Sequence, residues 1–191
     1  MITLIIGTPD SGKSALAEKL AVEQAKANDI SRPKNQSRLI YLATMIAYDE
    51  AGRKRIEKHR KQREGKGFIT IEKAMEIFDE PELFQEKDTV LLECITNLVG
   101  NEMYENTEKY LGTSEKNIRK IDGEAVSDKI AKDIEKLSLV VRNLVIVSNR
   151  FSDQEMASYD DETRKYMETV NRVNGRLTLL ADETINLHRE G

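Results

Sequence analysis

The sequence predicts an α/β fold built on a mostly parallel sheet that carries helices on both faces. Short apolar runs alternate along the chain with longer charged stretches of helical period. The first apolar run leads directly into a glycine-rich motif of the kind that binds phosphate between a strand and a helix. The 191 residues contain no internal repeat and no proline-rich linker, so we expect residues 1–191 to form one domain.

The predicted strands are short runs rich in leucine and β-branched residues, which is the pattern of strands buried on both faces. They lie at residues 2–6, 38–44, 89–95 and 144–149. The predicted helices repeat apolar residues every three or four positions between charged ones. They cover Ser14–Asn28, Asp49–Glu64, Asn97–Glu105, Glu124–Val141 and Asp160–Ala181. Residues 105–124 are mostly polar, and we expect them to form an excursion on the surface.

Charge is distributed unevenly along the chain. The formal net charge is −4, which argues against a general nucleic-acid-binding domain. Residues 53–66 nevertheless carry eight lysines and arginines against two glutamates. So concentrated a basic patch suits a small polyanion, such as the phosphates of a nucleotide, better than a duplex.

The composition also indicates a compartment. The single cysteine, Cys94, excludes an internal disulfide framework and fits reducing conditions. The N-terminal MITLIIG lacks a basic leader and is too short for a signal peptide, and no apolar run approaches membrane-spanning length. We therefore expect a cytoplasmic protein without a membrane span.

The strongest motif is GTPDSGKS, which matches the pattern G-x-x-x-x-G-K-[ST] of P-loop proteins. It comprises Gly7, Thr8, Pro9, Asp10, Ser11, Gly12, Lys13 and Ser14. Backbone N–H groups of such a loop bind phosphate oxygens, and Lys13 is expected to reach the terminal phosphates. The Ser14 hydroxyl is expected to ligate Mg²⁺. The alternative is a glycine-rich turn that merely links strand to helix, but the full pattern predicts a nucleotide-binding site.

A phosphate-bound Mg²⁺ usually needs a carboxylate at the end of a neighbouring strand. Glu93 follows the apolar run TVLL and is the candidate. The alternative is that Glu93 begins the next helix, where it would interact favourably with the helix dipole. Thr44 ends the run YLAT and has a similar strand-end position, where ligands bind in open parallel sheets.

One of the two histidines lies within the basic segment. In a helix, Arg55, His59 and Arg63 recur at a spacing of four and share one face, so they can converge on one anion. A neutral imidazole beside arginines that hold a phosphate would be a nucleophile. Direct phosphoryl transfer from a P-loop nucleotide does not need one. The alternative is a polar residue on a solvated helix, and the spacing alone does not decide between the two.

Seven segments taken in order resemble the bifunctional adenosylcobinamide kinase/adenosylcobinamide-phosphate guanylyltransferase family of cobalamin biosynthesis. They are IIGTPDSGKS, IYLAT, RIEKHR, ITIE, VLLECITNLV, VIVSN and RVNGRL with ADE, and they span nearly the whole chain. The P-loop is common to many families. The element RIxxHR, followed by a T-x-E-like element and LLECIT, is much more specific.

This resemblance implies a RecA-like P-loop NTPase fold, commonly assembled as a homotrimer. It implies that adenosylcobinamide is phosphorylated by a nucleoside triphosphate, ATP or GTP, and then receives GMP from GTP. His59 matches the family's motif histidine, which would attack the α-phosphate of GTP, release pyrophosphate and pass the guanylyl group to adenosylcobinamide phosphate.

The resemblance also implies roles for other residues. It assigns Thr44 and the helix that carries Arg55, Arg60 and Arg63 to the guanine-nucleotide site. It assigns Glu72 and Glu93 to further nucleotide or metal contacts.

The chain departs from the family pattern toward its C-terminus. Many relatives have an acidic residue after VxSN, where this chain has Arg150. No final strand of the family's Gly-Ile-Pro type follows ADETINLHREG, so we expect one edge of the sheet to be shortened. His188 is interpreted as a surface residue and Cys94 as a buried thiol. The polar residues of the last predicted helix stay unassigned, namely Asn171, Arg172, Asn174 and Arg176.

Three functions are compatible with these motifs. They are the bifunctional enzyme, a kinase of another small alcohol whose His59 helix only binds phosphate, and a nucleotide-binding module that has lost catalysis. Arg150 favours the latter two, whereas His59 with Arg55 and Arg60 favours the first.

Overall fold

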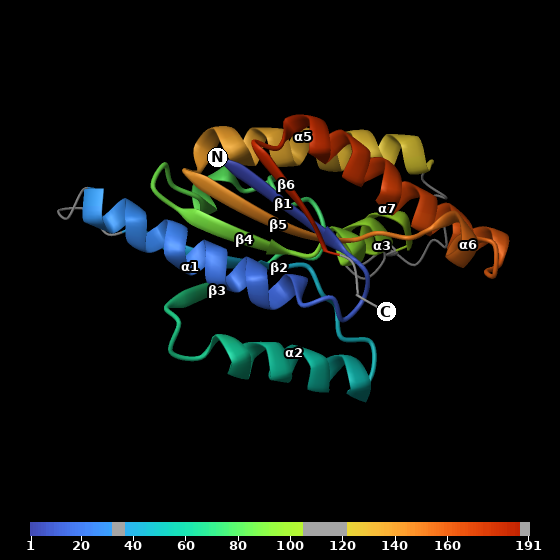
Figure 1. The fold of residues 1–191 in the computed structure, drawn as a ribbon, viewed down its shortest axis with the longest axis horizontal. Coiled ribbons are helices and arrows are strands. Elements are labelled where there is room, and N and C mark those ends of the chain that lie inside the picture. Colours follow the sequence, from blue (N-terminus) through green and yellow to red (C-terminus); the bar gives the residue numbers. More distant parts are fainter. Residues whose placement is uncertain (32–36, 105–121, 188–191) are drawn as a thin grey trace, which may run out of the picture.

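Six strands form one sheet in the order β3-β2-β4-β5-β1-β6, and every neighbouring pair is parallel (Figure 1). The strands are β1 (Ile2–Gly7), β2 (Leu39–Ala43), β3 (Phe68–Glu72), β4 (Thr89–Glu93), β5 (Asn143–Asn149) and β6 (Glu183–Leu187). This computed structural model describes residues 1–31, 37–104 and 122–187. The predicted α/β fold with a parallel sheet is confirmed. The predicted excursion at 105–124 falls almost entirely outside the described residues.

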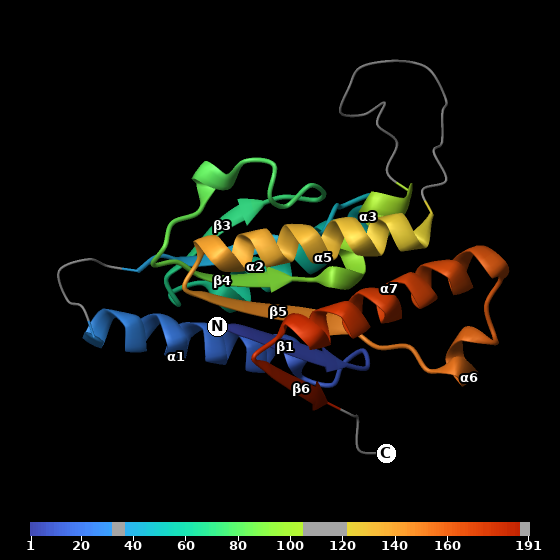
Figure 2. The ribbon, with the colours of Figure 1, turned by 90° about the horizontal axis from the view of Figure 1, so that it is seen from above.

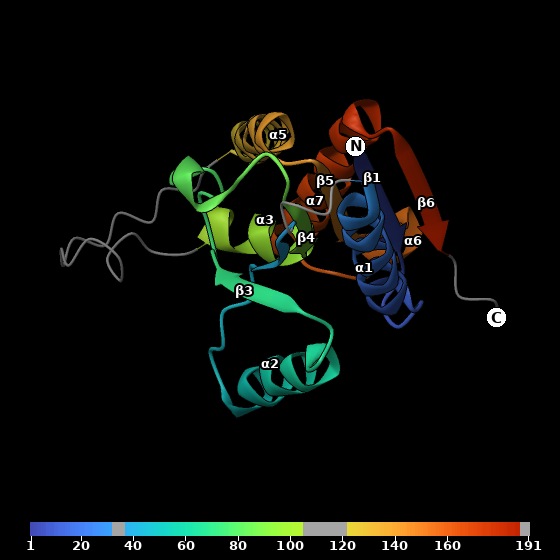
Figure 3. The same ribbon diagram turned by 90° about the vertical axis from the view of Figure 1, so that its left-hand side faces the viewer.

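Helices cover both faces of the sheet. They are α1 (Lys13–Ser31), α2 (Glu50–Arg63), α3 (Ile95–Tyr104), α5 (Gly123–Val140), the short α6 (Asp153–Met156) and α7 (Asp161–Leu180). In Figure 3, α3, α5 and α7 lie on one side of the strands and α1 on the other. The five predicted helices are all present, with ends within three residues of the predicted ones.

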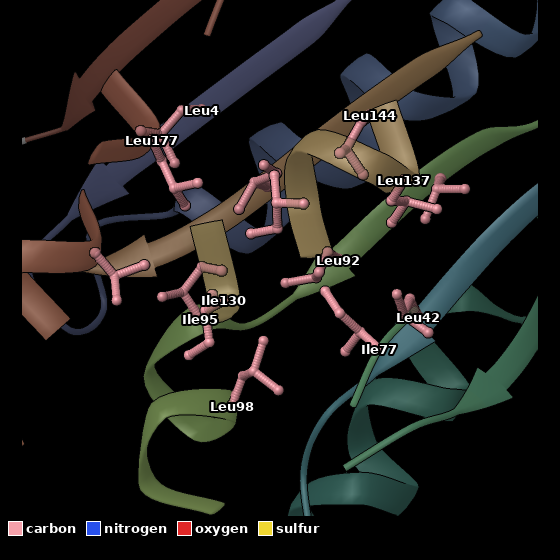
Figure 4. Close-up of a cluster of buried hydrophobic side chains, with 14 of the residues drawn as sticks. Leu4, Leu42, Ile77, Leu92, Ile95, Leu98, Ile130, Leu137, Leu144 and Leu177 are labelled. Atoms are coloured by element: carbon pink, nitrogen blue, oxygen red, sulfur yellow. The ribbon is translucent and has the colours of Figure 1, made fainter. Parts of the chain in front are cut away.

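The core consists of two apolar layers separated by the sheet. Val90 and Leu92 of β4 belong to the larger layer, which packs under α3, α5 and α7, and Figure 4 shows Leu92 within it. Leu91, between them, points to the other layer and packs with the alanines of α1. Because successive side chains of a strand face opposite sides, a strand covered on both faces is apolar at every position.

The strands β3 and β6 at the two edges of the sheet were not predicted. Their residues are either exposed or half-buried, and they form no continuous apolar run. At one edge, β6 pairs with β1 over five residues from Glu183 to Leu187, and the expectation of a shortened edge stays a prediction. A parallel edge strand needs only the ladder to its one neighbour, so its sequence carries a weak signal.

Helix α2 is anchored differently from the others. Its sole buried residue is Arg63, and it lies on the α1 side of the sheet below β3 (Figures 1 and 3). Its first turn is capped by Asp49, whose carboxylate accepts a hydrogen bond from the Gly52 backbone N–H at 2.7 Å. Polar contacts rather than an apolar face therefore hold α2 in place.

We expect Leu92→Ala to lower the free energy of unfolding by about 3 kcal/mol, because a fully buried leucine leaves a cavity when it is truncated. The matched control is Leu139→Ala, at a leucine of α5 that is 82% exposed, which should change stability by less than about 0.5 kcal/mol. Chemical denaturation of both variants measures the difference. Equal effects would contradict the described core.

Candidate nucleotide-binding site

The P-loop leaves β1, turns sharply and enters α1. A Cβ at Gly7 would lie 2.5 Å from Ser11 Oγ and 2.8 Å from the Leu187 carbonyl oxygen of β6, so only glycine fits there. Gly12 has a φ of 80°, in the left-handed region that favours glycine. Asp10 also lies there, with a φ of 60°, which aspartate tolerates better than most residues. The glycines of the motif are therefore required by the shape of the loop.

Lys13 is the central cation of the site and is only 8% exposed. Its Nζ donates a hydrogen bond to the Thr8 carbonyl oxygen at 2.8 Å, which folds the side chain back over the loop. Burial lowers the pKa of Lys13, while the nearby Glu93 and Asp10 carboxylates act in the opposite direction. The folded protein thus holds a cation in a place that disfavours charge, and a bound phosphate would relieve that cost.

A cavity of about 1470 Å³ lies in front of the loop, between α1, the ends of β2 and β4, and α2. Eleven of the predicted site residues line it: Pro9, Asp10, Gly12, Lys13, Ser14, Arg55, His59, Arg60, Arg63, Glu72 and Glu93. Gly7, Thr8, Ser11 and Thr44 do not appear among its lining residues. The cavity brings the P-loop and the basic helix together, although they are about forty residues apart in the sequence.

Glu93 ends β4 and faces this cavity from the centre of the sheet. Its Oε2 accepts a hydrogen bond from the Tyr41 hydroxyl at 3.1 Å. The Arg63 guanidinium lies over the Tyr41 ring, 3.3 Å from the ring centroid, in a cation–π contact. Burial raises the pKa of Tyr41, with the Glu93 carboxylate as a second cause, so the phenol stays protonated and keeps donating. This stack connects α2 to the carboxylate at the end of β4.

The residues present fit Mg²⁺ held together with substrate phosphates. Among the described residues, no group of three or more His, Cys, Asp and Glu side chains could hold a metal by itself. Mg²⁺ in P-loop sites usually takes one hydroxyl, one carboxylate, phosphate oxygens and water. Ser14 and Glu93 supply one hydroxyl and one carboxylate to the same cavity. Bound there, the ion would neutralise charge on the phosphates.

The three residues that the spacing of four placed on one face, Arg55, His59 and Arg63, all line the cavity, together with Arg53, Lys58 and Arg60 of the same helix. Arg55 is exposed and His59 is half-buried. The His59 Nδ1 is buried and has no hydrogen-bond partner among the described residues, and the same is true of one Arg63 nitrogen, Nη1. The predicted face of the helix therefore exists, but Arg63 packs on Tyr41 while Arg55 stays in solvent.

Two ion pairs lie at the C-terminal end of α2. Arg60 pairs with Glu72 at the end of β3, so these two predicted nucleotide-binding residues contact each other. Lys66, just after α2, pairs with the buried Glu18 of α1. Both contacts are short and charged, and Glu18 was not predicted because its partner lies 48 residues away.

Thr44 is fully buried at the end of β2 and does not line the cavity. Its hydroxyl donates to the Cys94 carbonyl oxygen at 2.9 Å and accepts from the Cys94 N–H at 2.8 Å. Its own carbonyl oxygen accepts from the Asn101 amide of α3 at 2.7 Å. This geometry favours a supporting role for Thr44, beneath the site. Asn101 and Tyr41 are supporting residues that sequence reasoning missed.

These features define a P-loop nucleotide-binding protein, and a solved structure agrees. That structure is described as an ATPase domain, and it superimposes with a TM-score of 0.51 at 16% sequence identity, covering 99% of this chain and 69% of that one. At this identity the likeness shows the fold alone, a RecA-like P-loop domain. The predicted fold class is thereby confirmed.

The sequence profile of the cobinamide kinase/cobinamide phosphate guanyltransferase family matches residues 3–189, nearly the whole chain. The chain belongs to this family, whose members combine the two transferase activities. The predicted resemblance is confirmed. A comparison with curated protein sequences finds no significant match.

None of the helices that the structure describes combines the length and the apolar character that a membrane-spanning helix needs.

We expect Lys13→Met to reduce turnover of nucleoside triphosphates about 100-fold or more, because the cation at the terminal phosphates is lost. Its melting temperature should equal or exceed that of the parent, because an apolar side chain of similar length suits a buried position. The control is Lys19→Met on the exposed face of α1, which should change neither quantity. Unchanged turnover in Lys13→Met would exclude the P-loop from the reaction.

We expect Glu93→Gln to raise the Mg²⁺ concentration for half-maximal activity about tenfold or more. The amide oxygen can still accept from the Tyr41 hydroxyl, so the fold is kept while the charge is removed. Activity is titrated with Mg²⁺ at fixed nucleotide, and melting is recorded alongside. Superimposed titration curves would place the metal elsewhere and leave Glu93 as a structural residue.

Proposed function

We propose that this protein phosphorylates adenosylcobinamide with a nucleoside triphosphate and then transfers GMP from GTP to adenosylcobinamide phosphate through a guanylyl-histidine at His59. Family membership supports the two activities. The histidine intermediate is the finer part of the proposal, and it rests on the position of one side chain.

The observation that carries the proposal is that His59 shares a cavity with the P-loop. A kinase that only transfers the terminal phosphate has no need of an imidazole there. The buried His59 Nδ1 is inaccessible, which leaves Nε2 as the nitrogen that can reach a ligand. Arg55, one turn before His59, lines the same cavity and can stabilise charge on an attacked phosphate.

The guanylyl transfer balances as two displacements at the α-phosphorus of GTP. In the first, the lone pair of His59 Nε2 forms a P–N bond as the bond from the α-phosphorus to the bridging oxygen breaks, and pyrophosphate leaves with that electron pair. In the second, a phosphate oxygen of adenosylcobinamide phosphate forms a P–O bond as the P–N bond breaks. His59 is regenerated neutral, so one residue serves as both nucleophile and leaving group.

In the kinase step the chain mainly positions charge. The backbone N–H groups of the P-loop and Lys13 bind the phosphates, and Ser14 and Glu93 would hold Mg²⁺. Glu72, paired with Arg60, stands at the opposite wall of the cavity and supports the nucleotide-binding helix. ATP and GTP are the substrates proposed for this step.

Three further expectations concern the oligomeric state, the cellular location and nucleic-acid binding. A homo-oligomer, a trimer in the family, stays a prediction that sedimentation of the purified protein tests. A cytoplasmic location and the lack of nucleic-acid binding also stay predictions, supported by the single cysteine and the net charge of −4.

We expect His59→Ala to reduce covalent labelling by GTP carrying label on the α-phosphate more than about 100-fold, because no other group supplies the nucleophile. Phosphorylation of adenosylcobinamide should persist, since that reaction needs no protein nucleophile. The label on the parent should be acid-labile and base-stable, as a phosphoramidate is. A denaturing gel with both proteins measures it.

The control variant is Lys54→Ala, which removes a cation from the same helix at a position outside the cavity lining. It should label like the parent. Label that persists on His59→Ala would place the nucleophile elsewhere. Absence of label on the parent, with the kinase reaction intact, would favour a kinase of a small alcohol, and loss of both would favour a nucleotide-binding module.

A further inference from the structure

A second cavity, of about 720 Å³, lies at the same carboxyl edge of the sheet. Its walls come from α7, from the segment Arg150–Glu155 that follows β5, and from the ends of β1 and β6. Figure 2 shows α6, α7 and β6 on this side of the sheet, away from α2. Arg150 is part of the wall, so the segment in which this chain departs from the family pattern contributes to a cavity of its own.

The two cavities differ in charge. The nucleotide cavity is lined by seven lysines and arginines and by five carboxylates. Among the described residues that line the second cavity, Arg150 is the single basic one, and Asp153 and Glu155 are acidic. The other polar groups of its wall are amides and hydroxyls. A polyphosphate is therefore attracted to the first cavity, whereas the second suits an uncharged polar molecule.

One face of α7 forms much of the wall. Asn171, Asn174, Gly175 and Thr178 recur at spacings of three and four, so they lie side by side on the helix. The Asn171 amide is occupied on both sides, because it accepts from the Phe151 N–H at 3.2 Å and donates to the Phe151 carbonyl oxygen at 2.7 Å. That contact fixes the segment after β5 against α7 and keeps the cavity walls in place.

The side-chain oxygen of Asn174 is a buried acceptor that receives no hydrogen bond from the described residues. Asn174 is 5% exposed, and its Nδ2 donates to the Asn149 carbonyl oxygen at 2.8 Å, which fixes the orientation of the amide. Its Oδ1 has no hydrogen-bond partner among the described residues. A buried acceptor left unsatisfied is unfavourable, so a shift of the wall that let a ligand N–H or O–H reach this oxygen would be favoured.

Gly175 has no structural reason to be glycine. It lies inside the helix α7, where glycine is destabilising relative to alanine. Its φ is outside the left-handed region, and a Cβ built there would meet no atom within 4 Å. Neither the backbone nor helix packing requires glycine at this position. Gly175 is exposed and lines the second cavity, so a larger side chain at this position would stand at the mouth of the cavity.

Thr8 links the two cavities. Its carbonyl oxygen accepts from Lys13, on the nucleotide side, and Thr8 is among the residues that line the second cavity. The Thr8 Oγ1 is buried and, like Asn174 Oδ1, has no partner in the described part of the chain. A molecule bound in the second cavity would therefore lie against the loop that holds the terminal phosphates.

We propose that the second cavity binds an uncharged carboxamide- or hydroxyl-bearing part of the molecule that accepts the phosphoryl group. The inference rests on the proposed function, under which this acceptor is a cobinamide, a molecule with carboxamide arms. Exposed polar side chains of the wall, such as Thr178 and Asn186, can hydrogen-bond such an arm, and Gly175 leaves room for it. The cavity holds one arm of the acceptor while the reacting hydroxyl faces the P-loop.

The test is the affinity of cobinamide for the full chain, measured by isothermal titration without nucleotide, for the parent and for Gly175→Leu. We expect Gly175→Leu to weaken binding at least tenfold, because leucine would obstruct the mouth of the cavity. Its melting temperature should not fall, since leucine favours the helix. Covalent labelling by GTP should be unchanged, since that step needs no acceptor.

Two control variants separate the cavity from the helix. Gly175→Ala adds only a Cβ and should bind cobinamide nearly as the parent does. Glu168→Leu places the same bulky side chain on the same face of α7 two turns earlier, outside the cavity lining, and should also bind normally.

The outcomes distinguish this inference from the proposed function. Parental affinity in Gly175→Leu, or no cobinamide binding by the parent, would overturn the inference even if GTP labels His59. Loss of GTP labelling as large as the loss of cobinamide affinity would also overturn it, because the two cavities would not be separate sites. Weakened cobinamide binding in Gly175→Leu supports it even if the parent takes no label.

Discussion

The parallel direction of all six strands is the constraint on which the other features of this protein depend. It collects every strand's carboxyl end at one edge of the sheet, where the P-loop, Glu93 and both cavities are found. Backbone N–H and C=O groups just past the strand ends have no neighbouring strand to pair with. Side chains of the helices supply their hydrogen-bond partners. Asn101 donates to the Thr44 and Ala74 carbonyl oxygens, and Thr96 accepts from the Asn149 N–H. These hydrogen bonds hold the carboxyl edge of the sheet in place and leave room for the two cavities.

Helix α2, on the other side of the nucleotide cavity, is held mainly by contacts of charged side chains. The basic helix α2 has no apolar face, and the contacts that hold it are the stack of Arg63 on Tyr41 and ion pairs of Arg60 and Lys66. Such contacts are weaker than the apolar burial that fixes α3 or α5, so we expect α2 to open locally more readily than those helices. A polyanion that bridges Lys13 and α2 would stabilise both.

Local patterns in the sequence predicted the central strands, five helices and the P-loop, because each of those signals lies within about twenty adjacent residues. The edge strands were missed since their half-exposed residues lack an apolar run. The stack of Arg63 on Tyr41 joins residues more than twenty positions apart on different elements, and no spacing rule connects them. Likewise, RVNGRL was noticed as a family segment, but only packing shows that Gly175 opens into a cavity.

The first glycine of the P-loop is confined by the edge strand as well as by the loop. A Cβ at Gly7 would press on the Leu187 carbonyl oxygen, and β6 cannot yield without losing its pairing with β1. The residue that fits at position 7 is therefore tied to the position of β6. A last strand placed farther outward would remove one of the two close contacts at position 7, whereas β6 in this register keeps both and holds the position to glycine.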